Sequence, residues 1–426
     1  MIKKVFKSID LKGDHIINKN MFLFLFGKLV SLLGSRMMSF AIGLYVLTIT
    51  GSGMSFAFSM IISTIPAILL SPLAGAIADK SNRKLIVVLM DILSGSLLLG
   101  IFIVSRIYGL TMILIYTTIF FLSVFNTFFS VAIEASIPNI VDEERLTKVN
   151  SYNSSINSLA TIFGPVLGGF VFGFINIETF IGLNGISFIL SGISEMFIDF
   201  RLGAKESKNE LFTKDKNLFL DIKAGFEYIK TKKVIFITLI FSIYINFVFS
   251  AYSVALPYII NNKLGLTSEQ YGFIQASFAI GSLLFSILFP IISEKKDTYF
   301  LIILGLFITS FFMMITGVPT LLPFKTMGTS IHLVYFLLIN FIIGSALIFI
   351  NLPFFIMLQR ETTDEYRGRV NGLLGTMSLS ISPLGMLIGG LLVDFLPSII
   401  LPLISGILFF ILTVILHKQS ELKKLL

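Results

Sequence analysis

Long apolar stretches constrain the fold of this chain more than any other feature of the sequence. A helix needs about 20 apolar residues to cross the hydrocarbon core of a bilayer. Hydrophobic residues make up 55% of the chain and charged residues only 13%, more apolar surface than a soluble protein can bury. We therefore predict an all-α integral membrane protein. The predicted spans number twelve: 21–48, 55–77, 85–105, 110–133, 151–174, 180–200, 234–258, 271–292, 298–317, 332–356, 371–393 and 399–417.

The positive charges predict how the chain is oriented in the membrane. Lys and Arg gather in the termini and in alternate loops, and only Arg106, Lys263 and Lys325 fall on the opposite side. The positive-inside rule then places both termini in the cytoplasm. Topology accounts for the net charge of +8, so we expect no nucleic-acid partner.

The sequence offers no pattern for metal, cofactor or enzyme chemistry. Cysteine is absent, which excludes disulfides and thiolate metal sites, and the three histidines have no metal-ligand spacing. There is no G-x-x-x-x-G-K-[ST] loop and no recognisable nucleophile–base–acid arrangement. We expect a protein without catalytic residues, metal or cofactor.

One polar interruption divides the spans into six and six. We predict an N-terminal six-helix bundle at 1–200, a cytoplasmic linker at 201–233 and a C-terminal six-helix bundle at 234–426. Within the linker, 218–230 has apolar residues at helical spacing and predicts an amphipathic helix on the membrane surface.

The two halves repeat each other. Val149-Asn150 recurs as Val370-Asn371, and Gly168-Gly169 recurs as Gly389-Gly390, both at an offset of 221 residues (149 to 370, 168 to 389). Two parallel six-helix pseudo-repeats are a transporter architecture in which the substrate binds between the halves. The sequence therefore predicts a membrane transporter rather than a simple anchor.

The segment Pro72–Lys84 (PLAGAIADKSNRK), here called the latch segment, lies between the second and third spans. Gly75 allows two backbones to approach closely. Asp79 follows at the C-terminal end of the span, where the helix dipole disfavours a negative charge unless the N-terminus of another helix docks against it. This arrangement predicts a latch between two membrane helices.

The latch segment resembles the loop 2–3 signature of the major facilitator superfamily. The match covers Gly75, Asp79, Lys80, Arg83 and Lys84, while Asn82 replaces the second glycine. GPVLGG in the fifth span (Gly164, Pro165, Gly168, Gly169) resembles the tail of the antiporter signature, although Ala160 and Ser151 replace its upstream glycines. The stretches 137–156, 366–373 and 382–394 are similar to the macrolide-efflux branch of bacterial drug:H⁺ antiporters.

This resemblance implies a function. We expect a monomeric permease of the bacterial plasma membrane that exports amphipathic small molecules such as macrolide-like compounds, in exchange for protons, by alternating access. Asp79 would face the start of the eleventh span near Val370–Leu373, and the glycines of the fifth and eleventh spans would allow close packing. Arg83 and Lys84 would pair with cytoplasmic acids, with Asp91 as the nearest candidate.

Ionisable residues inside spans are costly and therefore candidates for function. We expect Arg36 to line the cavity, whereas Lys28 is nearer the cytoplasmic end and is expected to snorkel. Glu134 and Asp91 are the proton-coupling candidates, with Glu134 preferred. Glu195 and Asp199 lie near the cytoplasmic boundary and are expected to pair with bases. The second half has no acid in the middle of a span, so we expect coupling to reside in the first half.

Neutral polar side chains within spans are candidates for shaping a substrate cavity, although in an apolar bundle most serve as interhelical hydrogen-bond partners. The candidates are Asn126, Asn157, Tyr244, Asn246, Gln275 and Asn351. Two rival functions remain: a lipid or siderophore exporter of the same fold, and a non-transporting membrane sensor or assembly protein.

Overall fold

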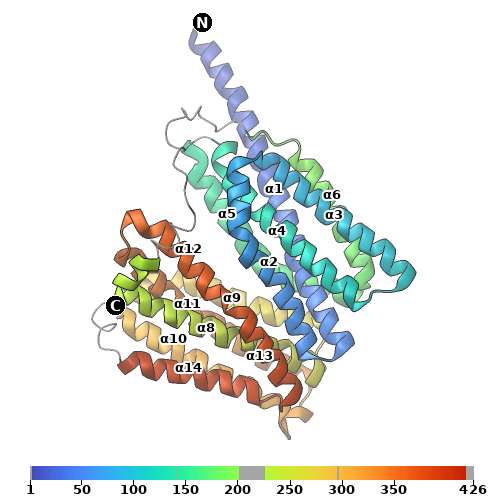
Figure 1. Ribbon diagram of the computed structural model, residues 1–426, viewed down its shortest axis with the longest axis vertical. Helices are drawn as coiled ribbons and strands as arrows, with labels where there is room; N and C mark the ends of the chain where they lie inside the picture. Colours follow the sequence, from blue (N-terminus) through green and yellow to red (C-terminus); the bar gives the residue numbers. More distant parts are fainter. Residues whose placement is uncertain (1, 142, 201–225, 295–296, 419–426) are drawn as a thin grey trace. The chain divides into compact units, whose positions relative to one another are not determined.

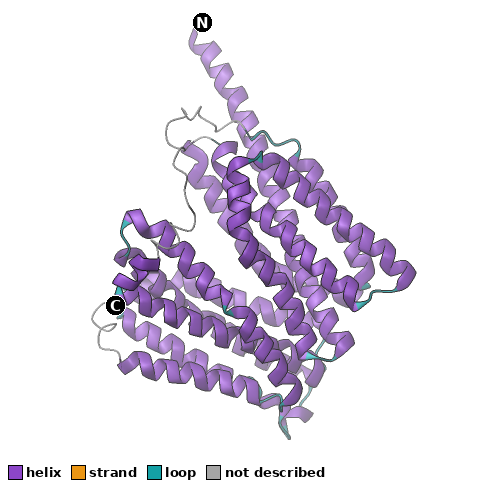
Figure 2. Cartoon of the chain, viewed as in Figure 1, coloured by secondary structure: helices purple, strands orange, loops and turns teal. Residues whose placement is uncertain are grey.

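The computed structural model describes residues 2–141, 143–200, 226–294 and 297–418. These residues form helices and turns, and no strand occurs among them (Figure 2). Within these ranges, 12 helices are long and apolar enough to cross a membrane. Each overlaps one predicted span, with ends that differ by at most seven residues, so the predicted all-α membrane fold is confirmed.

Contacts divide the chain into two compact units. Unit 1 comprises Met1–Ile42 and Ile62–Thr213, and unit 2 comprises Gly43–Ile61 and Lys214–Leu426. The tip of the hairpin formed by the first two helices therefore belongs to unit 2. The division into bundles at 1–200 and 234–426 stays a prediction of the sequence.

Unit 1 is built on the first six helices (Figure 1): α1 Ile2–Thr50, α2 Gly53–Lys80, α3 Arg83–Tyr108, α4 Met112–Ile140, α5 Glu143–Phe174 and α6 Ile177–Glu195. Helix α3 packs along both α4 and α6. Asn82 accepts a hydrogen bond from the backbone N–H of Leu85 and so caps the start of α3. The core of this unit gathers Phe24, Val87, Ile133 and Val149 from four different helices.

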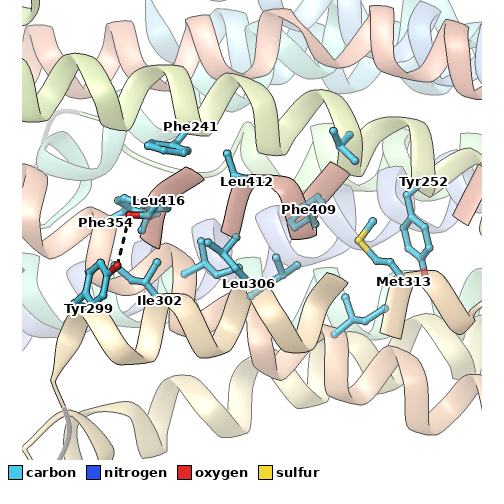
Figure 3. Close-up of a cluster of buried hydrophobic side chains, with 14 of the residues drawn as sticks. Phe241, Tyr252, Tyr299, Ile302, Leu306, Met313, Phe354, Phe409, Leu412 and Leu416 are labelled. Atoms are coloured by element: carbon cyan, nitrogen blue, oxygen red, sulfur yellow. Dashed lines mark hydrogen bonds between the residues drawn. The ribbon is translucent and has the colours of Figure 1, made fainter. Parts of the chain in front are cut away.

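Unit 2 contains the remaining helices: α8 Lys233–Pro257, α9 Ser268–Ser293, α10 Thr298–Ile315, α11 Thr329–Glu361, α12 Asp364–Ser380, α13 Ser382–Phe395 and α14 Ile400–Lys418. A short π-helix, Tyr258–Lys263, continues α8, and the 3-10 turns Val318–Thr320 and Phe324–Thr326 precede α11. Figure 3 shows its apolar core, in which Leu306, Phe354 and Phe409 pack together. The hydroxyl of Tyr299 there donates to the backbone oxygen of Leu416 at 3.5 Å.

The eleventh predicted span is two helices rather than one. Helix α12 ends at Ser380 and α13 begins at Ser382, with Ile381 between them. Pro383 follows in the first turn of α13. Because proline has no N–H and its ring crowds the preceding turn, it interrupts the helix at this point.

The predicted amphipathic helix at 218–230 lies mostly outside the described residues. Residues 226–231 are helical. Tyr228 in this stretch stacks on Tyr366 of α12, with ring centroids 4.4 Å apart. Ile229 is buried beside Val370 and Leu358 in the same apolar cluster. The end of the linker is thereby attached to the beginning of the eleventh span.

Candidate functional site

The glycines of the fifth span allow α5 to lie directly against α1. A Cβ atom at Gly164 would be 2.5 Å from the Cβ of Arg36, and one at Gly168 would be 2.9 Å from the backbone oxygen of Met37. Only glycine fits at such distances, as in other small-xxx-small contacts between membrane helices. Gly169 is also buried, and Pro165 lies within the continuous helix α5.

Unit 2 contains the equivalent contact between α13 and α8. A Cβ at Gly385 would collide with the backbone oxygen of Phe247, and one at Gly389 would lie 2.6 Å from the backbone oxygen of Ala251. The glycines of both spans are thus used for close packing, as expected. Each pair packs on the first membrane helix of its own half.

A polar pocket lies between α1, α4 and α5 in unit 1. Three of the predicted site residues, Asn126, Glu134 and Asn157, line it together with Lys28 and Ser31. The hydroxyl of Ser35, one turn beyond Ser31, is 2.9 Å from the side-chain oxygen of Asn126. The sequence could not bring these residues together, because they come from three helices.

Lys28 and Glu134 are the charged residues that line this pocket. The ammonium group of Lys28 donates to the side-chain oxygen of Asn153 at 2.5 Å and lies 3.4 Å from the carboxylate of Glu134. The side chain of Lys28 is 5% exposed and that of Glu134 is 57% exposed. The expectation that Lys28 snorkels to the membrane surface is wrong, because a buried amide and a neighbouring carboxylate satisfy its charge inside the unit.

Asp91 occupies a second polar centre, between α1, α3 and α6. Its carboxylate accepts a hydrogen bond from Ser31 at 2.5 Å, and Ser31 is 2.9 Å from Ser191. Neither Arg83 nor Lys84 forms an ion pair with Asp91 among the described residues, which corrects the predicted pairing. Both groups of residues, the pocket and this centre, meet at Ser31.

Glu195 belongs to the same centre, although the sequence did not indicate it as a site residue. It is fully buried, and neither of its carboxylate oxygens has a hydrogen-bond partner in the described part of the chain. The expectation that it pairs with a base is therefore wrong. The i, i+4 spacing of Ser191 and Glu195 on α6 was the one available signal.

The latch segment makes contacts within unit 1. Arg83 lies 3.3 Å from the carboxylate of Asp79 and donates to the backbone oxygens of Ala78 and Ala135. Lys84 donates to the backbone oxygen of Ile198 at 2.8 Å. Asp79 has a side chain that is 74% exposed, and a Cβ built at Gly75 meets no atom within 4 Å. Lys80 is exposed at the end of α2. The docking of Asp79 on the eleventh span stays a prediction.

Asp394, near the end of α13, makes the kind of contact that was expected of Asp79. It accepts hydrogen bonds from the backbone N–H groups of Gly53 at 2.6 Å and Met54 at 3.0 Å, and from the hydroxyl of Ser52 at 2.7 Å. These groups form the N-terminus of α2, whose positive dipole end favours a carboxylate. Gly390 brings the two backbones close enough, because its Cβ position is 2.9 Å from the Cα of Met54.

The fifth and the eleventh predicted spans each have an exposed polar face, on α5 in unit 1 and on α12 in unit 2. On α5 this face comprises Ser151, Ser154, Ser155, Ser158 and Thr161. Most exposed side chains on the other spans are apolar, as lipid requires, whereas hydroxyl groups in a span suit a water-filled path. The corresponding exposed face on α12 includes Gly372, Gly375, Thr376 and Ser380.

Arg36 lies beside the polar face of α5. It is exposed, and its Cβ touches Gly164, one turn after Thr161. Among the described residues, no hydrogen-bond or ion-pair partner satisfies its guanidinium group. A cation in this place can contact a solute in a water-filled path.

The candidate residues of unit 2 are bonded within their own unit. Tyr244 donates to the backbone oxygen of Leu408, Asn246 to that of Ser242, and Gln275 to the hydroxyl of Tyr271. Asn351 is exposed on α11. Among the described residues, no group of three or more His, Cys, Asp or Glu side chains could hold a metal ion.

The described residues form 12 helices long and apolar enough to cross a membrane, together with a buried polar network and exposed polar faces, as expected of a multi-pass membrane transporter. The model of the major facilitator superfamily matches residues 24–382 of the chain. The chain therefore belongs to this superfamily, and the resemblance found in the sequence is confirmed.

Relatives with assigned roles are distant. The chain is 23% identical over 367 residues to macrolide efflux protein A of Streptococcus pyogenes, covering 85% of this chain and 86% of the relative. It is 23% identical to the staphyloferrin A transporter of Staphylococcus aureus, covering 53% of this chain and 55% of that protein. Together they support a transporter of the bacterial membrane.

Solved structures agree on the fold. A bacterial homologue of the iron transporter ferroportin, crystallised in an inward-facing state, superposes with a TM-score of 0.71 at 19% identity, covering 94% of this chain and 99% of that one. The nucleoside transporter NupG gives a TM-score of 0.69 at 15% identity, covering 94% and 98% of the two chains. At such identities the likeness extends to the fold alone.

Proposed function

We propose that this chain is a secondary active transporter that exports amphipathic small molecules, such as macrolide-like compounds, by alternating access coupled to proton influx. The observation that carries the proposal is the concentration of buried ionisable side chains in unit 1. Lys28, Asp91 and Glu195 are the buried Lys, Asp and Glu side chains among the described residues. Membrane proteins keep such costly groups where ions or protons are moved.

Other features support the substrate side of this proposal. The exposed hydroxyl face of α5 leads to Arg36, and the pocket at Lys28 places Asn126 and Asn157 within the same unit. The similarity to macrolide efflux proteins covers most of the chain, which favours a drug-like substrate. With both termini in the cytoplasm, the membrane potential would supply about 2.3 kcal/mol per proton per 100 mV.

The direct test uses everted membrane vesicles with an imposed pH gradient. Vesicles with the chain should accumulate a macrolide or an amphipathic dye, and vesicles with the Asp91→Asn variant should not. A protonophore should abolish the accumulation. Accumulation that is unaffected by the protonophore would exclude proton antiport and leave export by another driving force.

A second candidate, favoured by Arg36, is export of an anionic siderophore. A guanidinium group without a protein partner suits a carboxylate-bearing solute, and one relative is a staphyloferrin A transporter. Arg36→Gln should then weaken binding of the siderophore at least tenfold in a thermal-shift titration but leave macrolide binding unchanged. Arg106→Gln, an exposed arginine at the end of α3, is the matched control.

A further inference from the structure

The junction of α1, α3 and α6 contains more acid than base. Asp91 is 2% exposed and Glu195 is 0% exposed. Gly27 and Ser31 lie one turn apart on α1, and Ser191 and Glu195 lie one turn apart on α6. The Cβ position of Gly27 is 3.2 Å from a carboxylate oxygen of Glu195 and 3.6 Å from the hydroxyl of Ser191.

Asp91, on α3, points toward the same junction between α1 and α6. The Cβ position of Gly192 on α6 is 3.3 Å from the Cβ of Asp91, and Ser31 bridges Asp91 to Ser191. The glycines at 27 and 192 therefore allow two acidic side chains to approach from different helices. A Cβ atom at either position would crowd these side chains, at 3.2 Å from Glu195 for position 27 and 3.0 Å from Ile92 for position 192.

The hydroxyl groups of the site are directed at Asp91, at Ser191 and at the backbone oxygen of Gly27. Ser31 donates to Asp91, and Ser191 is 3.2 Å from the backbone oxygen of Gly27. Glu195 receives no hydrogen bond from any described residue, although both of its oxygens are buried. A buried carboxylate in this state is strongly unfavourable beside a second one.

The charged groups on the surrounding elements are engaged elsewhere. Lys28 on α1 is bonded to Asn153 and Glu134, and Lys84 on α3 is bonded to the backbone oxygen of Ile198. Asp199, which follows α6, is a further negative group. Within the described part of the chain, neither carboxyl group has an ion-pair partner.

We propose that Asp91 and Glu195 together bind a single proton. This inference rests on the proposed function, because it assigns the coupling proton of the transporter to this pair. One proton converts one carboxylate into a carboxylic acid, removes one negative charge and supplies the missing donor. A hard metal cation would need about six oxygen ligands directed at one point. Here Ser31 and Ser191 already direct their hydroxyls at oxygen atoms of the site.

The site lies near one end of the unit. Asp91 is eight residues into α3, which is about 12 Å along the helix from its start at Arg83. Glu195 is the last residue of α6. A small separation of α6 from α1 and α3 would therefore open this proton site to water at the end where the latch segment lies.

The test is an acid–base titration of the purified protein in detergent, with the infrared band of protonated carboxyl groups as a second readout. Glu195→Gln and Asp91→Asn should each bind one proton fewer than the unmodified chain across neutral pH and lose one carboxyl band. Glu178→Gln, the same change at the opposite end of α6, should behave as the unmodified chain. Replacing sodium by choline should change nothing.

The results separate this inference from the proposed function. If Glu195→Gln titrates like the unmodified chain, or if sodium displaces the proton, the inference is wrong, even where vesicles still show proton-driven export. If the Gln variant does not fold, Ser191→Ala retains both carboxyl groups and should move the midpoint of the same titration; an unmoved midpoint overturns the inference. If transport is unaffected by the protonophore, the proposed proton antiport is wrong, but the titration result for the Asp91–Glu195 pair still stands.

Discussion

The two units of the molecule use the same helix contact but bury different chemistry. In unit 1, Gly164 and Gly168 pack α5 on α1, and in unit 2, Gly385 and Gly389 pack α13 on α8. Unit 1 then buries Lys28, Asp91 and Glu195, whereas unit 2 buries hydroxyl and amide groups such as the Tyr252–Thr316 pair. The repeated contact preserves the architecture, and under the proposed antiport the difference places the coupling groups in unit 1.

The largest expected effect tests whether the two glycine contacts are equivalent. Gly164→Val and Gly385→Val should each destabilise the fold by about 3 kcal/mol or more, because the added methyl groups meet atoms on or next to the neighbouring backbone. Thermal unfolding in detergent and the monodisperse yield measure this loss. Gly100→Val and Gly375→Val are controls with no atom within 4 Å of the Cβ position. A unit that tolerates its valine would break the equivalence.

The next effect tests the difference in buried charge. Glu134→Gln leaves Lys28 buried without a counter-charge and should cost about 1–2 kcal/mol, a value reduced by the exposure of Glu134 to water. Lys28→Met removes the buried charge itself and should cost less. In unit 2, Tyr252→Phe loses one neutral hydrogen bond and should cost about 1 kcal/mol. Unfolding midpoints in one detergent compare all of them, and equal losses for the Lys28 and Glu134 variants would contradict the assignment.

A smaller effect is expected at the N-terminus of α2. Asp394→Ala removes the acceptor of two backbone N–H groups and should cost about 1 kcal/mol, the usual value of a helix cap. Asp394→Asn retains part of the capping ability and should cost less. Hydrogen exchange at Gly53 and Met54 measures the cap locally, and unchanged protection in the Ala variant would show that these bonds contribute nothing.

The smallest effect on stability is expected at the other end of α2. Asp79→Asn breaks only an exposed i, i+4 ion pair with Arg83 and should change stability by less than about 0.5 kcal/mol. If the latch prediction holds, the variant still binds substrate but loses turnover in vesicles. Full transport by Asp79→Asn would contradict the latch prediction.

The sequence predicted what hydropathy and charge patterns control. Span positions follow from apolar length, and the restriction of buried acids to the first half follows from where Asp91 and Glu195 occur. The break at Ile381 had a local signal in Pro383. Each of these features is determined by residues close together in the sequence.

The site itself depends on contacts between helices, and these contacts could not be predicted from a single sequence. Lys28 meets Asn153 across 125 positions, and Asp394 meets Gly53 across 341. Lys28 was assigned to the membrane surface because its length permits snorkelling, yet the amide of Asn153 holds it inside. Asp394 docks on a helix N-terminus, a contact that the sequence did not predict for it, whereas the docking of Asp79 stays a prediction.

The hairpin tip at 43–61 has a consequence for motion. The boundary between the units cuts α1 at 42–43 and α2 at 61–62, inside continuous helices. Under the proposed alternating access, movement of one unit would either detach the tip from Asp394 or bend both α1 and α2 where the boundary cuts them. Pro66, whose missing N–H weakens α2, lies close to that boundary. Because the chain contains no cysteine, spin labels on Ser52→Cys and Leu396→Cys would be the sole labels, and their separation would reveal which of the two happens during a transport cycle.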